Sequence, residues 1–359
     1  MLDLAITIQQ IPAPTFEEGP RGEYMRARFL ERGLVDVEMD ALGNVYARLP
    51  GAGARPPLVV SAHLDTVFPA HTNLELVRSG KTVCGPGIGD NSLGLAGLLG
   101  LLWGMEELGL ELPGDLWLAA NVGEEGLGDL RGMRAVVDRF GRDVLAYLVL
   151  EGMALGQVYH RGLGVRRYRI AARTQGGHSW VDFGQPSAIH ALGALIARLD
   201  KIALPEEPRT TLNVGVIAGG TSVNTIAAEA CMELDLRSTS QLALDDLDGV
   251  VDRLIGAVDG QGVRFTREVI GDRPFGELPP GHPLVQLARE SLESAGIQPR
   301  LNVGSTDANI PLSRGLPAVC LGISTGGGAH TVGETINVPP IAQGLAQLLE
   351  FVTRVYARL

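Results

Sequence analysis

The chain has 359 residues, of which 45% are hydrophobic and 20% charged, and this composition excludes a disordered or collagen-like protein. The net charge of −11 argues against a nucleic-acid-binding surface, which must neutralise phosphates. A chain of this length is more often built as two domains than around one core.

Cysteine usage and apolar runs indicate the compartment. The three cysteines lie far apart and form no Cys-x-x-Cys pair, so neither a disulfide framework nor a thiolate zinc site is indicated. The sequence does not open with a basic segment followed by an apolar one. Its longest apolar run, 91–105, is shorter than the roughly 20 residues that span a bilayer. We expect a cytoplasmic protein that contacts neither membranes nor nucleic acids.

The first part of the chain alternates helical patterns with apolar runs of strand length. Helices are predicted at 2–9, 18–32 and 91–109. The last of these is expected to be capped by Asp90 and Asn91. Buried strands are predicted at 57–62, 116–122 and 144–150. This alternation is typical of a sheet whose parallel strands are connected by helices.

The middle of the chain has a different pattern, in which polar and apolar residues alternate along each strand. Strands are predicted at 163–173, 211–218, 228–237 and 262–270. Helices are predicted at 186–203 and 243–258. This order is the β-α-β-β-α-β order of a ferredoxin-like unit. The earlier alternation then returns, with a helix at 282–295, a strand at 317–322 and a helix at 340–358.

We therefore predict an α/β protein in which one domain is inserted into a loop of another. The first domain comprises residues 1–161 plus 274–359 and contains a mixed, largely parallel sheet flanked by helices. The inserted α+β domain comprises residues 162–273.

Potential metal ligands stand directly after the predicted strands or in neighbouring loops. They are His63, Asp90, Glu125, Glu151 and His330. Because ligands of open α/β sheets bind at the carboxyl ends of the strands, we expect these side chains to converge at one edge. Imidazole and carboxylate groups without thiolate suit zinc, and also manganese or cobalt.

Each motif also has an ordinary structural explanation when it is taken alone. Glu124 and Glu125 are typical of a solvated loop, and Asp90 before a helix is typical of an N-cap. His63 could be satisfied by the neighbouring Asp65. Together, however, so many carboxylates at one edge would repel each other unless cations neutralised them, and this favours a metal centre.

These motifs resemble a family of zinc-dependent exopeptidases and amidohydrolases, and the resemblance extends along nearly the whole chain. The family includes aminoacylase, glutamate carboxypeptidase, acetylornithine deacetylase, succinyl-diaminopimelate desuccinylase and tripeptidase T. The motifs are His63-x-Asp65-Thr66-Val67, the glycine-rich stretch ending in Asp90, Glu124-Glu125-Gly126, Leu150-Glu151-Gly152, and His330. The insertion matches the family's lid or dimerisation domain in position and strand order.

The resemblance implies a zinc-exopeptidase-like fold and a centre of two divalent metal ions, zinc by preference and manganese or cobalt as alternatives. Asp90 would bridge the two ions. His63 and Glu151 would complete the shell of one ion, and Glu125 and His330 that of the other.

The same resemblance implies how the centre is used. Asp65 would accept a hydrogen bond from His63 and fix the tautomer of that ligand. Glu124 would be the general base, which takes a proton from a metal-bridging water and passes it to the leaving nitrogen.

Three residues of the insertion match functional positions of the family. His178 resembles the lid histidine that, in dimeric relatives, reaches the partner's active site and stabilises the oxyanion. Asn224 and Arg237 match residues that hold the substrate. An arginine suits a carboxylate because it can donate two parallel hydrogen bonds, although Arg237 also fits an ordinary surface charge. The lid domain favours a homodimer.

The expected function is that of a metal-dependent hydrolase which cleaves an amide bond in a small substrate with a free carboxylate. N-acyl amino acids and short peptides both fit this class. The alternative is a di- or tripeptide aminopeptidase of the tripeptidase T type. A non-catalytic binding protein on the same fold is a more distant alternative.

One segment departs from the family. Many relatives carry Asp-x-Lys-Gly from the bridging aspartate onwards, whereas this chain reads Asp90-Asn91-Ser92-Leu93-Gly94. The missing lysine is not a ligand, so the predicted metal centre is unaffected. The peptide bond after the bridging aspartate is often cis in the family, and we expect a cis Asp90–Asn91 bond.

A competing hypothesis is a serine hydrolase, because Gly322-Ile323-Ser324-Thr325-Gly326 follows a strand and fits the pattern of a nucleophile elbow. Two features argue against it. Gly327 and Gly328 stand where a helix should begin, and no aspartate occurs beyond Asp307.

Overall fold

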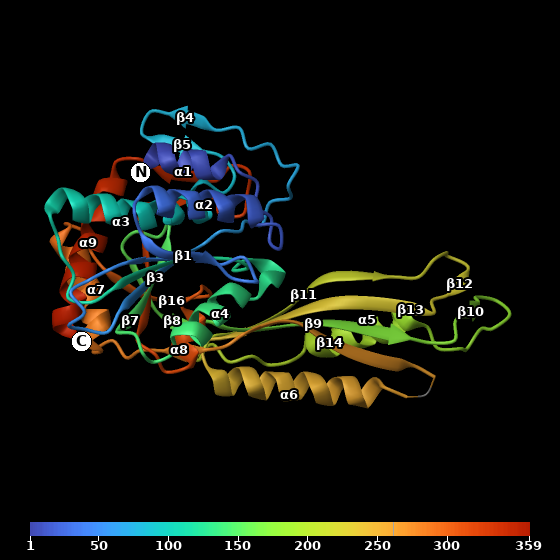
Figure 1. Ribbon diagram of the computed structural model, residues 1–359. Coiled ribbons are helices and arrows are strands. Elements are labelled where there is room, and N and C mark those ends of the chain that lie inside the picture. Colours follow the sequence, from blue (N-terminus) through green and yellow to red (C-terminus); the bar gives the residue numbers. More distant parts are fainter. Residues whose placement is uncertain (261) are drawn as a thin grey trace. The chain divides into compact units, whose positions relative to one another are not determined.

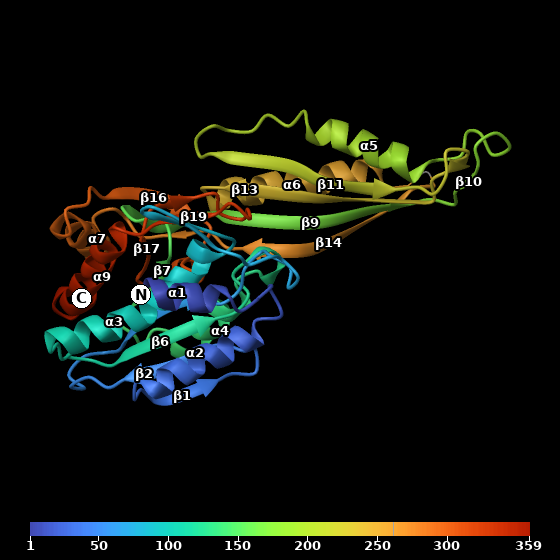
Figure 2. The same ribbon diagram turned by 90° about the horizontal axis from the view of Figure 1, so that it is seen from above.

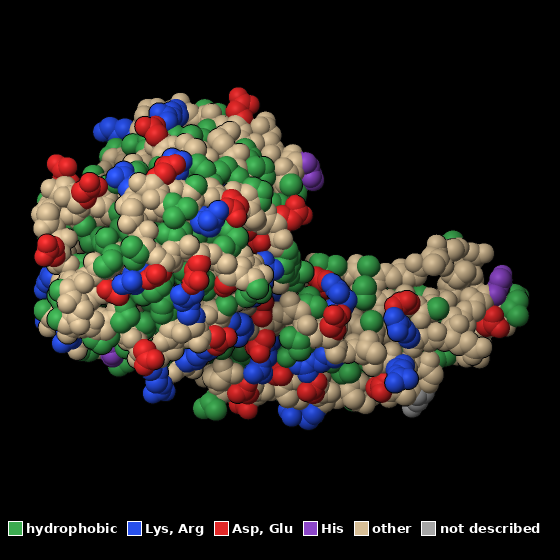
Figure 3. Space-filling view, viewed as in Figure 1, with side chains coloured by type: hydrophobic (Ala, Val, Ile, Leu, Met, Phe, Trp, Pro, Cys, Tyr) green, Lys and Arg blue, Asp and Glu red, His purple; other side chains and the backbone are tan. Residues whose placement is uncertain are grey.

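The computed structural model describes residues 1–260 and 262–359 and divides into two compact units (Figure 1). Unit 1 comprises Met1–Gly162 together with Gly276–Leu359, and unit 2 comprises Leu163–Phe275. Among the described residues, no helix is both long enough and apolar enough to cross a membrane. Acidic and basic side chains lie interspersed on the face of the molecule seen in Figure 3.

Unit 1 is built on a nine-stranded sheet with the order β1-β2-β6-β3-β7-β17-β8-β15, and β16 also pairs with β8. The strands are β1 (Val35–Met39), β2 (Val45–Leu49), β3 (Leu58–His63), β6 (Leu116–Asn121), β7 (Ala146–Glu151), β8 (Gln157–Gly162), β15 (Gly276–Glu277), β16 (Arg300–Gly304) and β17 (Ala318–Gly322).

The centre of this sheet is parallel and its margins are antiparallel. Strand β3 runs parallel to β6 and β7, β7 runs parallel to β17, and β16 runs parallel to β8. The pairs β1–β2, β2–β6, β8–β17 and β8–β15 are antiparallel. The predicted mixed, largely parallel sheet is confirmed.

Helices pack on the sheet of unit 1 (Figures 1 and 2). They are α1 (Leu2–Gln9), α2 (Gly19–Glu31), α3 (Gly94–Leu108), α4 (Arg131–Phe140), α7 (Pro283–Ser294), α8 (Asn309–Ser313) and α9 (Pro340–Arg358). Helix α3 packs against β3, β7, α1 and α9, which explains why its sequence is apolar almost throughout.

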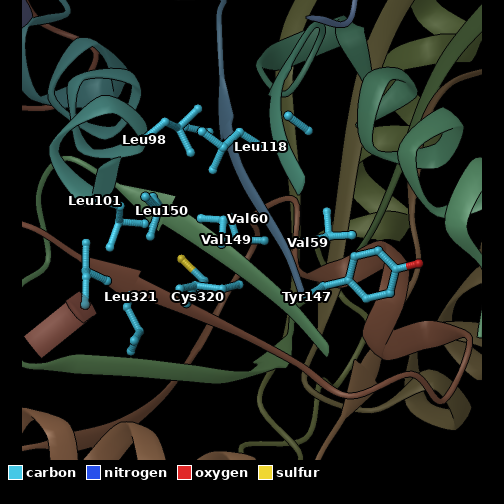
Figure 4. Close-up of a cluster of buried hydrophobic side chains, with 14 of the residues drawn as sticks. Val59, Val60, Leu98, Leu101, Leu118, Tyr147, Val149, Leu150, Cys320 and Leu321 are labelled. Atoms are coloured by element: carbon cyan, nitrogen blue, oxygen red, sulfur yellow. The ribbon is translucent and has the colours of Figure 1, made fainter. Parts of the chain in front are cut away.

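The central strands are buried on both faces, so they read as continuous apolar runs. Figure 4 shows Leu98 of α3 close to Leu118 of β6, and Leu101 of α3 close to Leu150 of β7. Gly97 of α3 lets the helix approach Ile323, because a Cβ on this glycine would lie 2.3 Å from the Ile323 side chain. The core therefore fixes the strand ends, where the candidate site residues are found.

A small antiparallel sheet of order β18-β19-β5-β4 joins two loops of unit 1. It consists of β4 (Val77–Ser79), β5 (Thr82–Cys84), β18 (Gly326–Gly327) and β19 (Thr335–Asn337). The pairing of β19 with β5 brings the loop that carries His330 beside the segment that leads to Asp90.

Unit 2 contains an antiparallel sheet of order β11-β13-β9-β14, with two helices packed against it. Its elements are β9 (Gly164–Arg173), α5 (Ala188–Leu199), β11 (Thr210–Gly219), β13 (Glu229–Ser238), α6 (Gln241–Val258) and β14 (Arg264–Arg273). A short pair, β10 (Gly177–His178) with β12 (Thr225–Ile226), stands apart from this sheet. The chain order strand-helix-strand-strand-helix-strand is the ferredoxin-like order.

The two faces of the unit 2 sheet differ. Apolar residues such as Ile170 and Leu234 are buried with α5 and α6 in a second hydrophobic core. The opposite face carries cross-strand ion pairs between β9 and β13. Arg167 lies 2.9 Å from Asp235, and Arg169 lies 3.0 Å from Glu233.

The start of α3 differs from the prediction. The helix begins at Gly94 rather than at 91, after a turn of π-helical type at Ile88–Leu93, in which Asp90 and Asn91 have non-helical backbone angles. The predicted cap is wrong, because the side chain of Asn91 is hydrogen-bonded to the Leu150–Gly152 segment instead. The expected cis peptide bond between Asp90 and Asn91 is confirmed.

Candidate metal centre

Strand ends and two adjacent loops of unit 1 bring the five candidate ligands together. Strand β3 ends at His63 and the neighbouring β7 ends at Glu151. Strand β6 leads into the loop that carries Glu125. Asp90 lies in the turn before α3, and His330 lies in the loop between β18 and β19.

The five side chains form two ligand groups that share Asp90. In the His63 group, His63 Nε2 lies 3.1 Å from Asp90 Oδ1 and 3.7 Å from Glu151 Oε2. In the His330 group, His330 Nε2 lies 3.2 Å from Asp90 Oδ2 and 3.1 Å from Glu125 Oε1. Asp90 therefore presents one carboxylate oxygen to each group.

These distances suit metal coordination. Ligand atoms bound at ~2.0–2.1 Å in a tetrahedral arrangement lie roughly 3.3 Å from one another. The histidine-to-carboxylate distances of 3.1–3.7 Å are close to this spacing, and each group combines one imidazole with two carboxylates whose ligand atoms lie within 4.8 Å of one another. A further combination, His63 with Glu124 and Glu125, also brings its ligand atoms within 4.8 Å of one another. The residues of both groups therefore fit a divalent cation.

The protonation of the metal-free groups reflects their crowding. Hydrogen bonds with Asp90 and Glu125 raise the pKa of His330 to about 10. Burial alone would lower the pKa of His63, but its carboxylate partners outweigh burial and hold that pKa well above the usual value. Burial raises the pKa of Glu151 to about 7. Burial acts in the same direction on Asp90, yet hydrogen bonds with the two histidines hold the pKa of Asp90 below its ordinary value. Bound cations would displace these histidine protons, because a coordinating imidazole must be neutral.

Asp65 contacts His63 and is completely buried. His63 Nδ1 is 3.0 Å from the main-chain oxygen of Asp65 and 3.5 Å from its Oδ1. The carboxylate of Asp65 instead accepts hydrogen bonds from the main-chain N–H groups of Glu124 at 3.0 Å and Glu125 at 2.9 Å. Asp65 thus contacts both the histidine, chiefly through its main chain, and the glutamate loop.

Glu18 supports the same loop and was not predicted from the sequence. It is buried, and its Oε1 accepts a hydrogen bond from the main-chain N–H of Gly123 at 3.0 Å. The Nη2 atom of Arg131 donates to both carboxylate oxygens of Glu18 at 3.1 Å. The main chain from Gly123 to Glu125 is therefore held by two buried carboxylates, those of Glu18 and Asp65.

Asn91 joins the Asp90 turn to the strand end that carries Glu151. Its Nδ2 donates to the main-chain oxygen of Leu150 at 2.9 Å, and its Oδ1 accepts from the main-chain N–H of Gly152 at 2.9 Å. Both bonds are buried, so the two carboxylates of the His63 group are fixed relative to each other.

Glu334 is a second buried side chain at the Asp90 turn that was not singled out from the sequence. Its Oε1 accepts hydrogen bonds from the main-chain N–H groups of Gly89 and Asp90. Burial raises the pKa of Glu334 to about 7.

Two of the predicted lid residues lie close together in unit 2. Strand β10 pairs His178 with Thr225 of β12, and Ser179 N donates to the main-chain oxygen of Asn224 at 3.1 Å. Both His178 and Asn224 are exposed. His178 Nδ1 accepts from the main-chain N–H groups of Trp180 at 3.2 Å and Val181 at 3.3 Å. This arrangement favours the tautomer in which Nε2 carries the proton and is a donor.

Arg237 is not brought near His178 and Asn224 within unit 2. It lies near one end of β13, whereas Glu229 lies at the end nearer the β10–β12 pair, and the intervening strand spans roughly 26 Å at about 3.3 Å per residue. Arg237 Nε donates to Asp235 Oδ2 at 2.6 Å, and the Arg237 side chain is 40% exposed.

The serine-hydrolase hypothesis receives no support from the geometry of Ser324. This serine is buried, and its hydroxyl donates to the main-chain oxygens of Asn337 and Thr325 rather than to a histidine. The segment from Gly326 to Gly327 is a short strand, not the helix that follows a nucleophile elbow.

Comparison with known families gives one match, to the model described as Peptidase family M20/M25/M40, over residues 59–354. An uncharacterised protein of Bacillus subtilis, YqjE, is 24% identical over 344 residues, which cover 90% of each chain. A protein of Aspergillus flavus named a probable carboxypeptidase is 25% identical over 311 residues, which cover 78% of this chain and 72% of that protein.

Solved structures share the fold. A tripeptidase from Staphylococcus aureus superposes with a TM-score of 0.82 at 22% identity, over 99% of this chain and 98% of the tripeptidase. The YXEP protein of Bacillus subtilis, described as a dinuclear metal binding peptidase, superposes with a TM-score of 0.72 at 18% identity, over 99% of this chain and 98% of YXEP.

Proposed function

Because the chain belongs to peptidase family M20/M25/M40, and is therefore a metallopeptidase or related amidohydrolase, we propose that it hydrolyses an amide bond in a small substrate with a free carboxylate. The observation that carries this proposal is the position of Asp90, whose two carboxylate oxygens face His63 and His330 in two separate ligand groups.

We propose that the His63 group and the His330 group each hold one divalent cation, with Asp90 shared between them. Zinc is the preferred ion, and manganese and cobalt are alternatives with the same ligand chemistry. Two cations at such a centre supply a water of lowered pKa and a polarised substrate carbonyl. The likeness to a dinuclear metal binding peptidase supports this assignment.

We propose Glu124 as the general base. Its side chain is buried beside that of Glu125, and its main-chain N–H is fixed by Asp65. A carboxylate held in this way can take a proton from the attacking water and return it to the leaving nitrogen. The neighbouring Glu125 faces His330 and belongs to the ligand group, so the two acids have different tasks.

Unit 2 supplies the remaining proposed residues, as the lid domain of a catalytic unit 1. The Nε2–H group of His178 is a donor suited to a developing oxyanion, because Nδ1 is already occupied as an acceptor. Asn224 lies beside His178 and is proposed to hold the substrate. Arg237 is proposed to bind the substrate carboxylate with its terminal nitrogens, because its Nε already donates to Asp235.

We propose that unit 2 also forms a homodimer. Strand β11 lies at the edge of its sheet and exposes Val216 and Ile217. Beside His178, the side chains of Trp180 and Phe183 are 85% and 90% exposed. Exposed apolar surface of this kind is typical of an interface. We also propose that the protein is cytoplasmic.

The class of substrate distinguishes the main proposal from the aminopeptidase alternative. N-acyl amino acids and dipeptides with a free carboxylate are the expected substrates, which makes the enzyme a deacylase or carboxypeptidase. The similarity of fold to a tripeptidase, and the pairing of Arg237 with Asp235, keep a tripeptide aminopeptidase as the second candidate.

Turnover of a substrate panel tests the proposal. The protein is loaded with zinc, manganese or cobalt and assayed against N-acyl amino acids, dipeptides, tripeptides and their C-terminal amides. Hydrolysis of free acids, with a loss of about tenfold or more after chelation, is expected. Activity that a chelator leaves unchanged would contradict the metal centre, and binding without turnover would identify a non-catalytic protein. Tripeptide cleavage that depends on a free amino end would favour the aminopeptidase.

A further inference from the structure

The Asp90 turn is contacted from a second side by Glu334, whose side chain is fully buried. Glu334 Oε1 accepts from the main-chain N–H of Gly89 at 2.6 Å and from that of Asp90 at 2.8 Å. Its other oxygen, Oε2, is buried and has no hydrogen-bond partner among the described residues. The polar contacts of this carboxyl group are thus directed at the main chain on which Asp90 is carried.

The same residue is also tied to the loop of His330. The main-chain N–H of Glu334 donates to Thr331 at 3.1 Å, and its main-chain oxygen accepts from Gly85 at 2.8 Å. Thr331 directly follows His330, and Gly85 lies at the start of the segment that leads to Asp90. Glu334 therefore connects the two chain segments that supply Asp90 and His330.

Burying a carboxyl group costs free energy, and hydrogen bonds to its oxygens offset part of this cost. Hydrogen bonds from groups around the first ligands commonly fix the orientation of those ligands. Here the N–H groups that donate to Glu334 belong to Asp90 itself and to Gly89. A shift of this acceptor would move the Asp90 carboxylate relative to His330 Nε2, which lies 3.2 Å away.

We propose that Glu334 is a positioning residue, whose carboxyl oxygen holds the main chain at Gly89 and Asp90 and so sets Asp90 against His330. This inference rests on the proposed metal centre and adds the residue that assembles its His330 group. Glu334 acts through Asp90 and does not itself contact the cation or the substrate.

Three substitutions separate the position of the acceptor from its charge. Glu334→Gln keeps an oxygen at the same reach and removes the charge. Glu334→Asp keeps the charge and withdraws the oxygen by one methylene. Glu334→Leu removes the acceptor and preserves most of the volume. Glu293, which is exposed in α7, supplies the matched controls Glu293→Gln and Glu293→Asp.

The experiment is a titration of the metal-free protein with Co²⁺, followed by visible absorbance and equilibrium dialysis. The variant His330→Ala identifies the absorbance that belongs to the His330 group. Thermal unfolding of each metal-free variant shows whether the chain still folds. If Glu334→Leu fails to fold, the comparison of Glu334→Asp with Glu334→Gln carries the test.

We expect Glu334→Asp and Glu334→Leu to weaken Co²⁺ binding in the His330 group by about 10- to 100-fold, while Glu334→Gln stays within about threefold of wild type. Wild-type Co²⁺ affinity in both Glu334→Asp and Glu334→Leu would overturn the inference. If Glu334→Gln loses Co²⁺ affinity in the His330 group while Glu334→Asp keeps it, the inference is also overturned, because the charge of the side chain would then matter rather than the position of its oxygen. A wild-type chain that binds fewer than two Co²⁺ ions would instead refute the proposed centre.

Discussion

At the scale of single residues, the two adjacent acids after β6 differ in their surroundings. Glu125 faces His330 at 3.1 Å, whereas Glu124 has no place in either of the two groups that share Asp90. Both main-chain N–H groups are held by Asp65. This difference is the basis for assigning proton transfer to Glu124 and coordination to Glu125.

The Glu124→Gln variant is expected to keep its metal ions and lose turnover by ~10²–10⁴-fold, because the amide cannot act as a general base. Metal analysis and steady-state kinetics on the same preparation check both parts. Activity near that of wild type would show that another group accepts the proton.

The Arg237→Met variant tests the proposed carboxylate contact. A charge-assisted hydrogen bond is worth ~1.5–3 kcal/mol, so kcat/KM for free-acid substrates should fall by roughly 10- to 150-fold. The variant should also lose its preference for free acids over the corresponding amides. If the wild-type enzyme shows no such preference, the carboxylate contact is wrong and the aminopeptidase alternative gains support.

At the scale of secondary-structure elements, we expect the ion pairs around Asp235 in unit 2 to stabilise the fold in a pH-dependent way. Burial opposes ionisation of Asp235, but hydrogen bonds from Arg237 and Arg167 outweigh it and lower the pKa of Asp235. A carboxyl group whose pKa is lower in the folded state stabilises the fold above its unfolded pKa, and this contribution is lost as the pH falls through the folded value.

The Asp235→Asn variant should therefore be less stable than wild type at pH 7 by about 0.2–1 kcal/mol, the range for cross-strand charge pairs. The difference should vanish at a pH below the lowered pKa, where Asp235 is protonated in the folded and unfolded states alike. Denaturant unfolding at both pH values measures it. A difference that does not change with pH would show that the ion pairs contribute nothing.

The central strands β3 and β7 were predictable from the sequence, because each is a continuous apolar run, and these runs lead directly to the candidate ligands His63 and Glu151. Strand β1 was not predicted, since it is largely exposed and lacks an apolar run. Helix α4 was also missed, although Met133, Val136, Val137 and Phe140 have helical spacing.

The supporting residues of the centre could not be predicted. Glu18, Asn91 and Glu334 bond to main-chain groups of segments distant in the sequence, and such contacts leave no characteristic spacing of side chains. Nearly every residue has a main-chain N–H group, so the sequence does not indicate which of these groups will donate a hydrogen bond to a given buried carboxylate. These contacts became visible only with the fold.

At the scale of the whole molecule, the proposed dimer determines whether His178 serves its own catalytic unit or that of the partner. We expect it to act across the dimer, because its loop exposes apolar side chains suited to an interface. Mixing Glu124→Gln with His178→Ala protein, each inactive alone, should then restore activity. A mixed dimer would contain one site with an intact base and an intact histidine.

Subunit exchange of the mixture is confirmed by mass spectrometry of differently tagged chains. A mixture that exchanges subunits and stays inactive would show that His178 acts within its own chain. A wild-type protein that sediments as a monomer would rule out the dimer itself.

The order in which the proposed ligands occur along the chain has a consequence for biosynthesis. His63, Asp90, Glu125 and Glu151 precede unit 2, whereas His330 follows it, and β17 must still enter the sheet between β7 and β8. A nascent chain that has just completed unit 2 therefore contains four of the proposed metal ligands but not His330. Metal acquired during translation could occupy the His63 group first, and the His330 group would close only after the ribosome has released the C-terminal segment. Maturation of the proposed centre would then be tied to completion of the polypeptide.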